Sequence, residues 1–264
     1  MAYRFEQTYR VRYDECNLYG LVTPVAVLRY LQDIAALDAV QSTLIGTGDW
    51  VARRTIMEFH APIPARAHLR LQTYPLGFTK VTAWRGYDLL LAGDAGNEPQ
   101  LAVKARTLWV YLDARGRPTR IPPDMLTIWI PPGTTLVLPP DEETWPTFPA
   151  QPQFETNAPV RFSDLDVMGH MNNAAYVELL DNATWEIFTQ NGLLPQQAHS
   201  YPAPLYYDIE YAASARPGET LQVHSWFEPI GSVTPLADQT FERLQRVQTD
   251  ATVLVRARSR WQWQ

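Results

Sequence analysis

The feature that most constrains this chain is a repeat within it. One copy begins at Val11 and reads VRYDECNLYGLVTPVAVLRYLQD, and the other begins at Val160 and reads VRFSDLDVMGHMNNAAYVELLDN. The copies align without a gap at a separation of 149 positions, which places Gly20 opposite Gly169. Chance similarity over so short a stretch is the alternative explanation. A true repeat indicates duplication of one structural unit and predicts two similar domains.

Each copy reads as a short strand, a loop that contains glycine, and a helix. After Thr23 and after Asn172, apolar residues recur with the period of a helix of about five turns. The segments that follow alternate in polarity and are rich in Val, Tyr, Trp and Thr, which is typical of antiparallel strands. These segments are Val51–His60, His68–Leu76, Val81–Leu91, Leu101–Leu112, Tyr206–Tyr211, Thr220–Phe227, Gln239–Gln248 and Thr252–Trp263. The pattern predicts an α+β fold in which each half packs one long helix against a curved antiparallel sheet.

A proline-rich stretch separates the two copies. Ten prolines fall between Pro118 and Pro152, and proline removes backbone donors and fixes φ, which indicates an extended linker. Apolar residues within it, such as Leu126–Ile130, predict that it packs along the surface. The expected division is a first domain over 1–125, a linker over 126–153 and a second domain over 154–264.

Composition limits the class of protein. The 264 residues are 46% hydrophobic and 19% charged, which is typical of a globular chain and argues against disorder. A net charge of −6 disfavours a general nucleic-acid binder. The one cysteine, Cys16, excludes an intramolecular disulfide, and we interpret it as a half-buried side chain rather than a nucleophile. No metal site is expected, because the remaining histidines lack ligand spacing. They are His60, His68, His199 and His224.

The N-terminal residues are charged and alternate in polarity, unlike a signal peptide. No apolar run approaches the roughly 18 residues that a membrane-spanning helix needs. These features lead us to expect a reducing, cytoplasmic location.

The strongest local signal is the segment Asp164–Asn173, DLDVMGHMNN, at the junction of strand and helix in the second copy. Gly169 permits a tight turn, and Asn172 or Asn173 can cap the helix that follows. The free N–H groups at the start of that helix can polarise an acyl carbonyl, as an oxyanion hole does. The segment therefore combines a polarising group with ionisable side chains.

Two side chains of this segment are candidates for chemistry. Asp166 is a candidate nucleophile or general base, and His170 is a candidate to orient substrate or water or to share the proton transfer. The alternative is a capped turn with solvated aspartates. The repeat favours chemistry, because the first copy has Asn17 in place of Asp166 and Leu21 in place of His170. We therefore expect a duplicated site of which one copy stayed reactive.

The second copy resembles the signature of hotdog-fold thioesterases, D-x-D-x-x-G-H-x-N-N-x-x-Y, which ends here at Tyr176. The whole chain resembles bacterial acyl-acyl-carrier-protein thioesterases, which contain two tandem hotdog domains. The stretches YLQDIAALDA, WVARRTIMEF, LWVYLDARGRPTRIP and IEYAASARPGE support the likeness. The resemblance implies hydrolysis of fatty acyl thioesters, most of all of acyl-acyl carrier protein (acyl-ACP), with no metal or organic cofactor. It also implies that Asp166 and His170 are catalytic.

The chain departs from the family pattern at several positions. Many members have Asn where this chain has Met168, and that residue often positions the thioester or water. Plant members carry a Glu-Cys pair where this chain has Ser214 and Ala215. Glu210 is a weak candidate for a replacement, and the alternative is an exposed strand residue.

We expect the two domains to pack as a pseudo-dimer with the pocket between them. The first would hold the acyl tail, and Trp50 is a candidate to cover it. In the second, Asp166, His170 and Asn173 are expected to be catalytic, with Gly169 and Asn172 binding substrate. The expectation leaves open a broad acyl-CoA thioesterase, a catalytically weak acyl-binding protein, a hotdog dehydratase, and a homodimer of such chains.

Charge indicates how a carrier would dock. Residues 1–132 carry a net +3 and residues 133–264 carry −9. An acidic acyl carrier protein would need a local basic surface. The candidate residues for that surface are Arg115, Arg117 and Arg120, with a solvated basic face as the alternative.

Overall fold

The computed structural model describes residues 3–41, 48–92, 98–136, 138–139, 144–193, 201–228, 239–250 and 252–264. The chain divides into two compact units, Met1–Thr144 and Trp145–Gln264. Each unit contains one copy of the repeat, and the fold of each follows from its own stretch of sequence.

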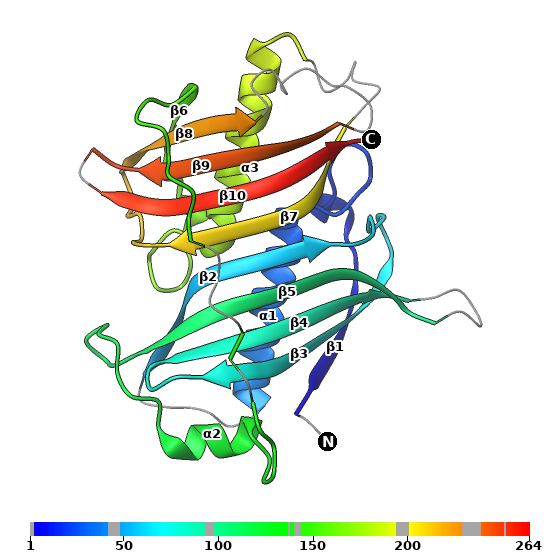
Figure 1. The fold of residues 1–264 in the computed structure, drawn as a ribbon, viewed down its shortest axis with the longest axis vertical. Helices are drawn as coiled ribbons and strands as arrows, with labels where there is room; N and C mark the ends of the chain where they lie inside the picture. The colour runs from blue at the N-terminus through cyan, green and yellow to red at the C-terminus, as the bar shows by residue number, and fades with distance from the viewer. Residues whose placement is uncertain are drawn as a thin grey trace. The chain divides into compact units, whose positions relative to one another are not determined.

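The first unit packs one long helix, α1 (Pro24–Gln41), along the face of an antiparallel sheet (Figure 1). The described strands of this unit are β1 (Phe5–Arg10), β2 (Asp49–Phe59), β3 (His68–Phe78), β4 (Thr82–Leu91) and β5 (Gln100–Leu112). They lie in the order β1-β3-β4-β5-β2. A short helix, α2 (Pro123–Trp129), follows β5.

The second unit repeats this arrangement around helix α3 (Asn173–Gln190). Its described strands are β6 (Phe154–Pro159), β7 (Pro202–Tyr211), β8 (Thr220–Glu228), β9 (Thr240–Gln248) and β10 (Val253–Trp263). They lie in the order β6-β8-β9-β10-β7, and the neighbours are antiparallel. In Figure 1 α3 lies along its own sheet as α1 does.

Capping residues determine where both long helices begin. The Thr23 hydroxyl accepts a hydrogen bond from the Ala26 amide at 3.2 Å, and Pro24 occupies the first helical position, where its missing N–H costs nothing. The Asn172 side chain accepts from the Ala174 amide at 2.8 Å and caps α3. Both helices therefore begin at the position that the repeat predicts.

The core of each unit lies between its helix and its sheet. In the first unit Ile34 of α1 is 0% exposed, as are Leu71 and Leu89 of the sheet. In the second unit Leu180 and Ile187 of α3 are likewise 0% exposed. Burying one such side chain stabilises a fold by about 1.5–3 kcal/mol, so the periodic apolar face of each helix is what attaches it to its sheet.

The predicted architecture of one long helix against an antiparallel sheet, twice over, is confirmed, and the predicted strands match the observed ones to within a few residues.

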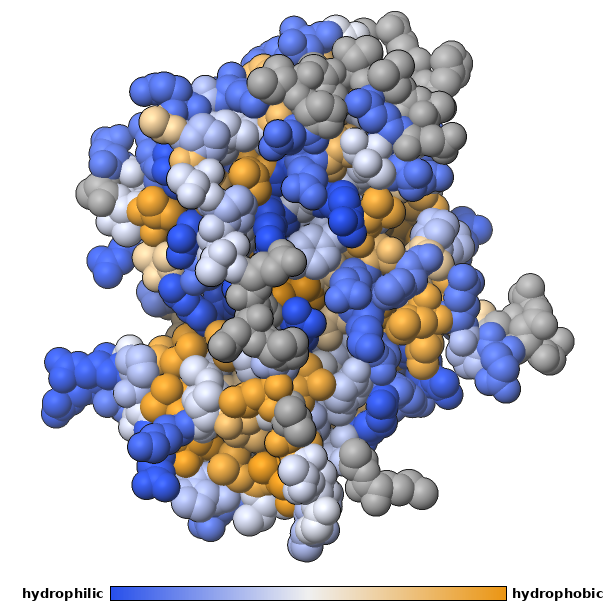
Figure 2. Space-filling model, viewed as in Figure 1, coloured by the Kyte–Doolittle hydropathy of each residue, from blue (hydrophilic) through white to orange (hydrophobic). Residues whose placement is uncertain are grey.

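Helix α2 was not predicted, because it lies within the proline-rich stretch. Met125 and Trp129 on its inner side are 5% and 4% exposed. Tyr111 and Ile121 pack with Met125 in one cluster. In Figure 2 hydrophobic side chains gather on the visible face of this unit, in the lower half of the view.

The segment that begins the second unit lies on the sheet of that unit. The Trp226 indole N–H donates to the Gln151 carbonyl oxygen at 2.8 Å. The Arg256 and Arg258 guanidinium groups lie 5.6 Å and 5.8 Å from the Trp145 ring centroid. The apolar and aromatic residues of this proline-rich segment thus make specific contacts.

In the described ranges, no helix is long and apolar enough to cross a membrane.

Candidate active site

The segment that connects β6 to α3 forms a tight turn closed by two backbone hydrogen bonds. The Asp166 amide donates to the His170 carbonyl oxygen at 2.9 Å, and the Gly169 amide donates to the Asp166 carbonyl oxygen at 3.0 Å. Gly169 has a φ of +75°, a conformation that side chains other than glycine rarely adopt. The turn therefore brings the backbone of Asp166 next to that of His170.

The first unit contains the same turn with different side chains. The Asn17 amide donates to the Leu21 carbonyl oxygen at 2.8 Å, and Gly20 has the same φ of +75° as its counterpart. The Asn17 side-chain oxygen accepts from the amides of Tyr19 and Leu21 at 3.0 and 3.1 Å. The backbone of the loop is thus retained in both copies, while the ionisable groups occur in the second copy alone.

The two aspartates of the motif have different environments. Asp164 is 5% exposed, and its carboxylate accepts hydrogen bonds from the Arg161 backbone amide at 2.8 Å and from the Arg161 guanidinium at 2.8 and 3.0 Å. The first unit has an acid in the same place, because Glu15 accepts from the Arg12 amide at 2.7 Å. An acid held by an arginine in both units has a structural role.

Asp166 is half-buried, and one hydrogen bond to its carboxylate is found within the described ranges, from the Met168 amide at 2.9 Å. A carboxylate has about four acceptor positions, so most of its hydrogen-bonding capacity is available to a water molecule or a substrate. His170 is exposed, and its ring has no hydrogen bond to any residue of the described part of the chain. Both side chains are therefore accessible to a ligand.

The start of α3 supplies donors beside this turn. Asn172 is the N-cap, and Asn173 is the first helical residue, whose backbone N–H has no acceptor among the described residues. The Asn173 carbonyl oxygen accepts a hydrogen bond from the Tyr211 hydroxyl at 3.2 Å, which holds the N-terminus of α3 in place. In the first unit this position is Pro24, which has no N–H. The polarising donor is thus absent from the copy that also lacks the ionisable pair.

The positions at which this chain departs from the family pattern lie close to the same turn. Met168 is 50% exposed at the tip of the turn. Ala215 is fully buried, its carbonyl oxygen accepts from the Met171 amide at 3.2 Å, and its amide donates to the Tyr176 hydroxyl at 2.7 Å. Burial raises the pKa of Tyr176 to about 12, so this hydroxyl stays protonated at neutral pH. Ser214 is exposed.

Glu210 is part of an ion pair between strands. Its carboxylate lies 2.6 Å from the Arg256 guanidinium, the residue opposite it on β10. In the first unit Glu58 lies opposite Lys104 in the matching register. A glutamate opposite a basic residue therefore recurs in both sheets, which favours a structural role for Glu210 over a catalytic one.

Cys16 lies in the loop of the first unit and is half-buried, with its thiol 3.6 Å from the Arg12 carbonyl oxygen. Its pKa is raised by burial and, to a lesser degree, by the nearby charges of Glu15 and Asp14. A thiol with a raised pKa is a poor nucleophile, in line with the expectation from the sequence.

Two family models match the chain, one in each unit. Residues 2–129 match the acyl-ACP thioesterase N-terminal domain, and residues 160–261 match the thioesterase-like superfamily. The two matches include both copies of the repeat. The chain belongs to the acyl-ACP thioesterase family. It is a thioester hydrolase that acts on fatty acyl thioesters.

Solved structures that match this acyl-ACP thioesterase over nearly its whole length have the same fold. An acyl-ACP thioesterase from Bacteroides thetaiotaomicron is 15% identical with a TM-score of 0.72, covering 98% of this chain and 97% of that one. The 12:0-ACP thioesterase from Umbellularia californica is 16% identical with a TM-score of 0.74, covering 99% and 94%. A protein described as an oleoyl thioesterase from Lactobacillus plantarum is 17% identical with a TM-score of 0.79, covering 99% and 96%. No curated protein matches the sequence. The predicted α+β class with two hotdog domains is confirmed.

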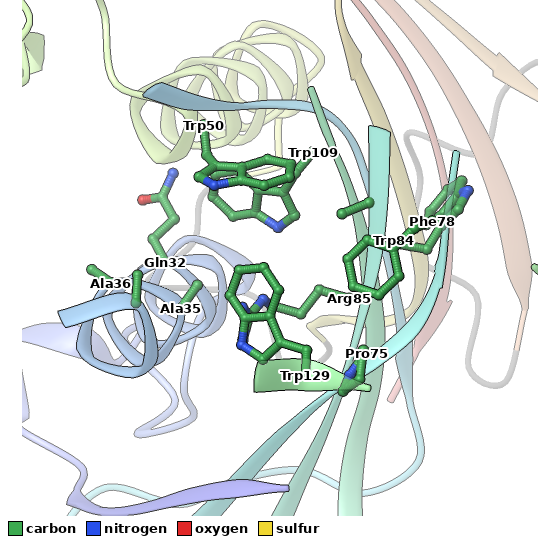
Figure 3. A pocket seen from close by; sticks show the side chains of 12 residues that line it. Gln32, Ala35, Ala36, Trp50, Pro75, Phe78, Trp84, Arg85, Trp109 and Trp129 are labelled. Carbon is green, nitrogen blue, oxygen red and sulfur yellow. The ribbon is translucent and has the colours of Figure 1, made fainter. Parts of the chain in front are cut away.

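The first unit of this acyl-ACP thioesterase contains an apolar cavity of about 190 Å³, shown in Figure 3. Trp50, the predicted cover of a pocket, lines it, and its ring centroid is 6.3 Å from that of Trp129. Phe78 stacks on Trp129 at 6.1 Å and 12°. The remaining lining residues are Gln32, Ala35, Ala36, Ala39, Pro75, Ala83, Trp84, Arg85 and Trp109.

Among these lining residues, only Trp50 was predicted from the sequence to border a pocket. A comparison of the two copies would have indicated part of the cavity. The helix positions of Ala36 and Ala39 are Trp185 and Phe188 in the second copy, 149 positions later. Small residues in one copy opposite large aromatic ones in the other indicate space in the first unit.

The candidate docking arginines are exposed on the first unit. The amides of Arg115 and Arg117 donate to the Asp113 carboxylate at 2.8 and 3.0 Å, which fixes the tight turn after β5 and leaves both guanidinium groups outside it. Arg120 follows on the same connection. By contrast, the guanidinium groups of Arg256 and Arg258 in the second unit pair with carboxylates, at 2.6 Å and 3.0 Å.

Proposed function

We propose that this thioesterase hydrolyses fatty acyl chains carried by acyl carrier protein, with the Asp166 turn performing the reaction and the cavity of the first unit receiving the acyl tail. The observation that carries the proposal is the pairing of an accessible carboxylate, Asp166, with the helix N–H of Asn173, which has no acceptor among the residues that the structure describes. The first copy has lost both groups, which are Asn17 and Pro24 there. Loss of base and donor together is expected if they serve one reaction.

The chemistry begins at the thioester carbonyl. The Asn173 N–H at the positive end of the α3 dipole stabilises the charge that develops on the carbonyl oxygen. Asp166 takes the proton from a water molecule as that water attacks the carbonyl carbon, or attacks the carbon itself and forms an anhydride that water then cleaves. In both routes the carbon–sulfur bond breaks, and the carrier thiolate leaves and takes up a proton. The products are a free fatty acid and the free carrier.

The other residues of the turn assist this step. His170 lies across the turn from Asp166, so its ring can orient water or return the proton to the leaving thiolate. Gly169 lets substrate approach the backbone closely, and Asn172 keeps the helix start in place through its hydrogen bond to Ala174. No residue of this set requires a metal or a cofactor.

The acidic carrier docks, in this proposal, on the exposed arginines of the first unit, because Arg256 and Arg258 of β10 already pair with acids. A single cysteine without a disulfide partner fits a reducing compartment, and we place the enzyme in the cytoplasm. An acyl-CoA thioesterase is the second candidate, because the Asp166 turn itself contains nothing that distinguishes the two carriers.

Thiol release from a panel of acyl-ACP substrates, hexanoyl to hexadecanoyl, tests this function. Each acyl chain is also supplied on coenzyme A. We expect hydrolysis of both, with higher kcat/KM on the carrier protein. Binding of acyl-ACP without thiol release would mean a binding protein instead, and dehydration of a hydroxyacyl substrate would mean a different hotdog enzyme.

A further inference from the structure

Both units place an arginine at the same point of their sheets. Arg85 on β4 lies opposite Thr107 of β5, and Arg243 on β9 lies opposite Ser259 of β10. Each side chain is on the helix side of its sheet, since each pairs with an acid of the long helix in its unit. The acid comes from a different helix position in each unit, Asp38 in the first and Asp181 in the second.

In the second unit the arginine fills that space. Arg243 is 2% exposed, and its guanidinium donates to Asp181 at 2.9 Å, to Thr184 at 2.6 Å and to Ser259 at 3.0 Å. Its central carbon lies 4.9 Å from the ring centroid of Trp261. Every polar group of the side chain is therefore held inside a packed core.

The first unit lacks the two helix residues that hold Arg243 in the second unit. The repeat places Gln32 where the second unit has Asp181, and Ala35 where it has Thr184. A neutral amide and a methyl group cannot replace a carboxylate and a hydroxyl as partners of a guanidinium. The first unit thus lacks the groups that hold the arginine in the packed position.

Arg85 instead pairs with an acid elsewhere on α1. Its guanidinium lies 2.5 Å from the Asp38 carboxylate and 3.3 Å from the Thr73 hydroxyl. Asp38 is 0% exposed and also accepts a hydrogen bond from the Tyr3 hydroxyl. It lies six residues after Gln32, about 9 Å further along the helix axis and about 120° around it. Its counterpart in the second unit is Ile187, which is fully buried.

The space that the arginine fills in the second unit is part of the cavity in the first. Gln32, Ala35 and Arg85 all line the cavity. Figure 3 shows the Arg85 side chain running from the sheet toward α1 beside Trp129, with the guanidinium carbon 5.3 Å from the Trp129 ring centroid. Arg85 thereby forms part of the wall of the cavity and leaves its interior open.

We propose that Asp38 is a specificity-determining residue that keeps the acyl cavity open by holding Arg85 against its wall. The position of one carboxylate on the helix, residue 38 in the first unit or residue 181 in the second, decides whether the arginine borders a cavity or fills a core. This inference rests on the proposed function only in taking the acyl chain as the occupant of the cavity.

The test moves the carboxylate to the position it has in the second unit. Gln32→Asp adds an acid where Asp181 stands, and Gln32→Asp with Asp38→Asn leaves that acid as the sole carboxylate partner for Arg85. We expect Arg85 to turn across the cavity in the double variant. The single variant keeps the buried ion pair, so it folds as the wild type does and should show a smaller effect in the same direction.

The first readout is kcat/KM across the acyl panel on one carrier. Each methylene that loses its place in the cavity should cost about fourfold, the equivalent of its burial free energy of about 0.8 kcal/mol. Long chains should thus lose tenfold or more, mainly through KM, and short chains should lose least. Asp33→Asn is the matched control, because Asp33 is an exposed acid of the same helix that bonds to Tyr9 at 2.7 Å. Its chain-length profile should be that of the wild type.

The second readout needs no catalysis. Four tryptophans line the cavity, so titration with a free fatty acid such as palmitate should change their fluorescence. We expect palmitate to bind the wild type and Asp33→Asn with the same affinity, and the double variant at least tenfold more weakly. Unchanged palmitate affinity and an unchanged chain-length profile in both Gln32 variants, with wild-type melting behaviour, would overturn the inference. If no acyl thioester is hydrolysed at all, the proposed function fails, whereas the fluorescence titration still decides the role of Asp38.

Discussion

The Asp166 amide donates to the His170 carbonyl oxygen at 2.9 Å, so the candidate base and the candidate imidazole originate at the two ends of one turn. The same bond joins Asn17 to Leu21 at 2.8 Å in the first unit. The duplicated backbone therefore provides a matched control for each candidate catalytic group of the second unit.

His170→Ala should lower kcat by about 10²- to 10⁴-fold, the usual contribution of a positioned acid–base group. The ring is exposed and has no hydrogen bond within the described part of the chain, so its removal should leave the melting temperature unchanged. Steady-state kinetics on acyl-ACP together with thermal melting check both points. Wild-type kcat in this variant would remove His170 from the mechanism.

Met168→Asn should raise kcat if an amide that positions water is what the chain lacks at this place. Met168 is 50% exposed, so the substitution costs little buried apolar contact. The measurement is kcat on the best acyl-ACP substrate, with Val167→Asn as the control, because Val167 is the neighbouring exposed side chain. A loss of activity, or no change, would mean that another group, such as Ser214, already positions the water.

Ala83→Phe should shorten the acyl chain that the enzyme prefers. Ala83 lines the cavity, and the residue at its place in the second unit is Phe241, which is buried against Phe188 at 6.3 Å. A phenyl ring would fill space that the acyl tail needs, as it fills the core of the second unit. The chain-length profile on one carrier checks this, and an unchanged profile would mean that the tail lies elsewhere.

Reversing charge at Arg115 and Arg117 should lower kcat/KM on acyl-ACP and leave hydrolysis of a short neutral thioester unchanged. Exposed charges attract the acidic carrier over a range of about 8 Å at physiological salt, so raising the salt should reproduce the effect in the wild type. Coenzyme A is also anionic, hence the same acyl chain must be compared on both carriers. Equal or better turnover of the coenzyme A form, with no response to the reversals, would indicate a general acyl thioesterase.

The repeat and the alternation of polarity were enough to predict the two long helices, the sheets and the turn between Asp164 and Asn173. These features are local, since the residues of the turn from Asp164 to Asn173 are neighbours in sequence as well as in space. Helix α2 was missed because proline density indicated an extended segment, whereas Pro122 and Pro123 precede and begin the helix, where proline is tolerated.

The cavity was missed for a different reason. Its walls come from α1, α2 and four strands of one sheet, and no local pattern places Trp50, Trp109 and Trp129 around the same space. The two arginines show the same limit. Arg85 and Arg243 have equivalent positions in their sheets, but their acid partners, Asp38 and Asp181, occupy different positions on the two long helices.

The most direct test of the central claim is the kcat of Asp166→Asn on acyl-ACP, measured beside Asn17→Asp. The amide is nearly the same size as the carboxylate and can keep the hydrogen bond from the Met168 amide, so the fold and melting temperature should be those of the wild type. We expect Asp166→Asn to lose nearly all thiol release, by at least about 10²-fold. We expect no gain of activity in Asn17→Asp, because Leu21 supplies no imidazole and Pro24 supplies no N–H. A near-normal kcat in Asp166→Asn would contradict the assignment of this turn as the active site.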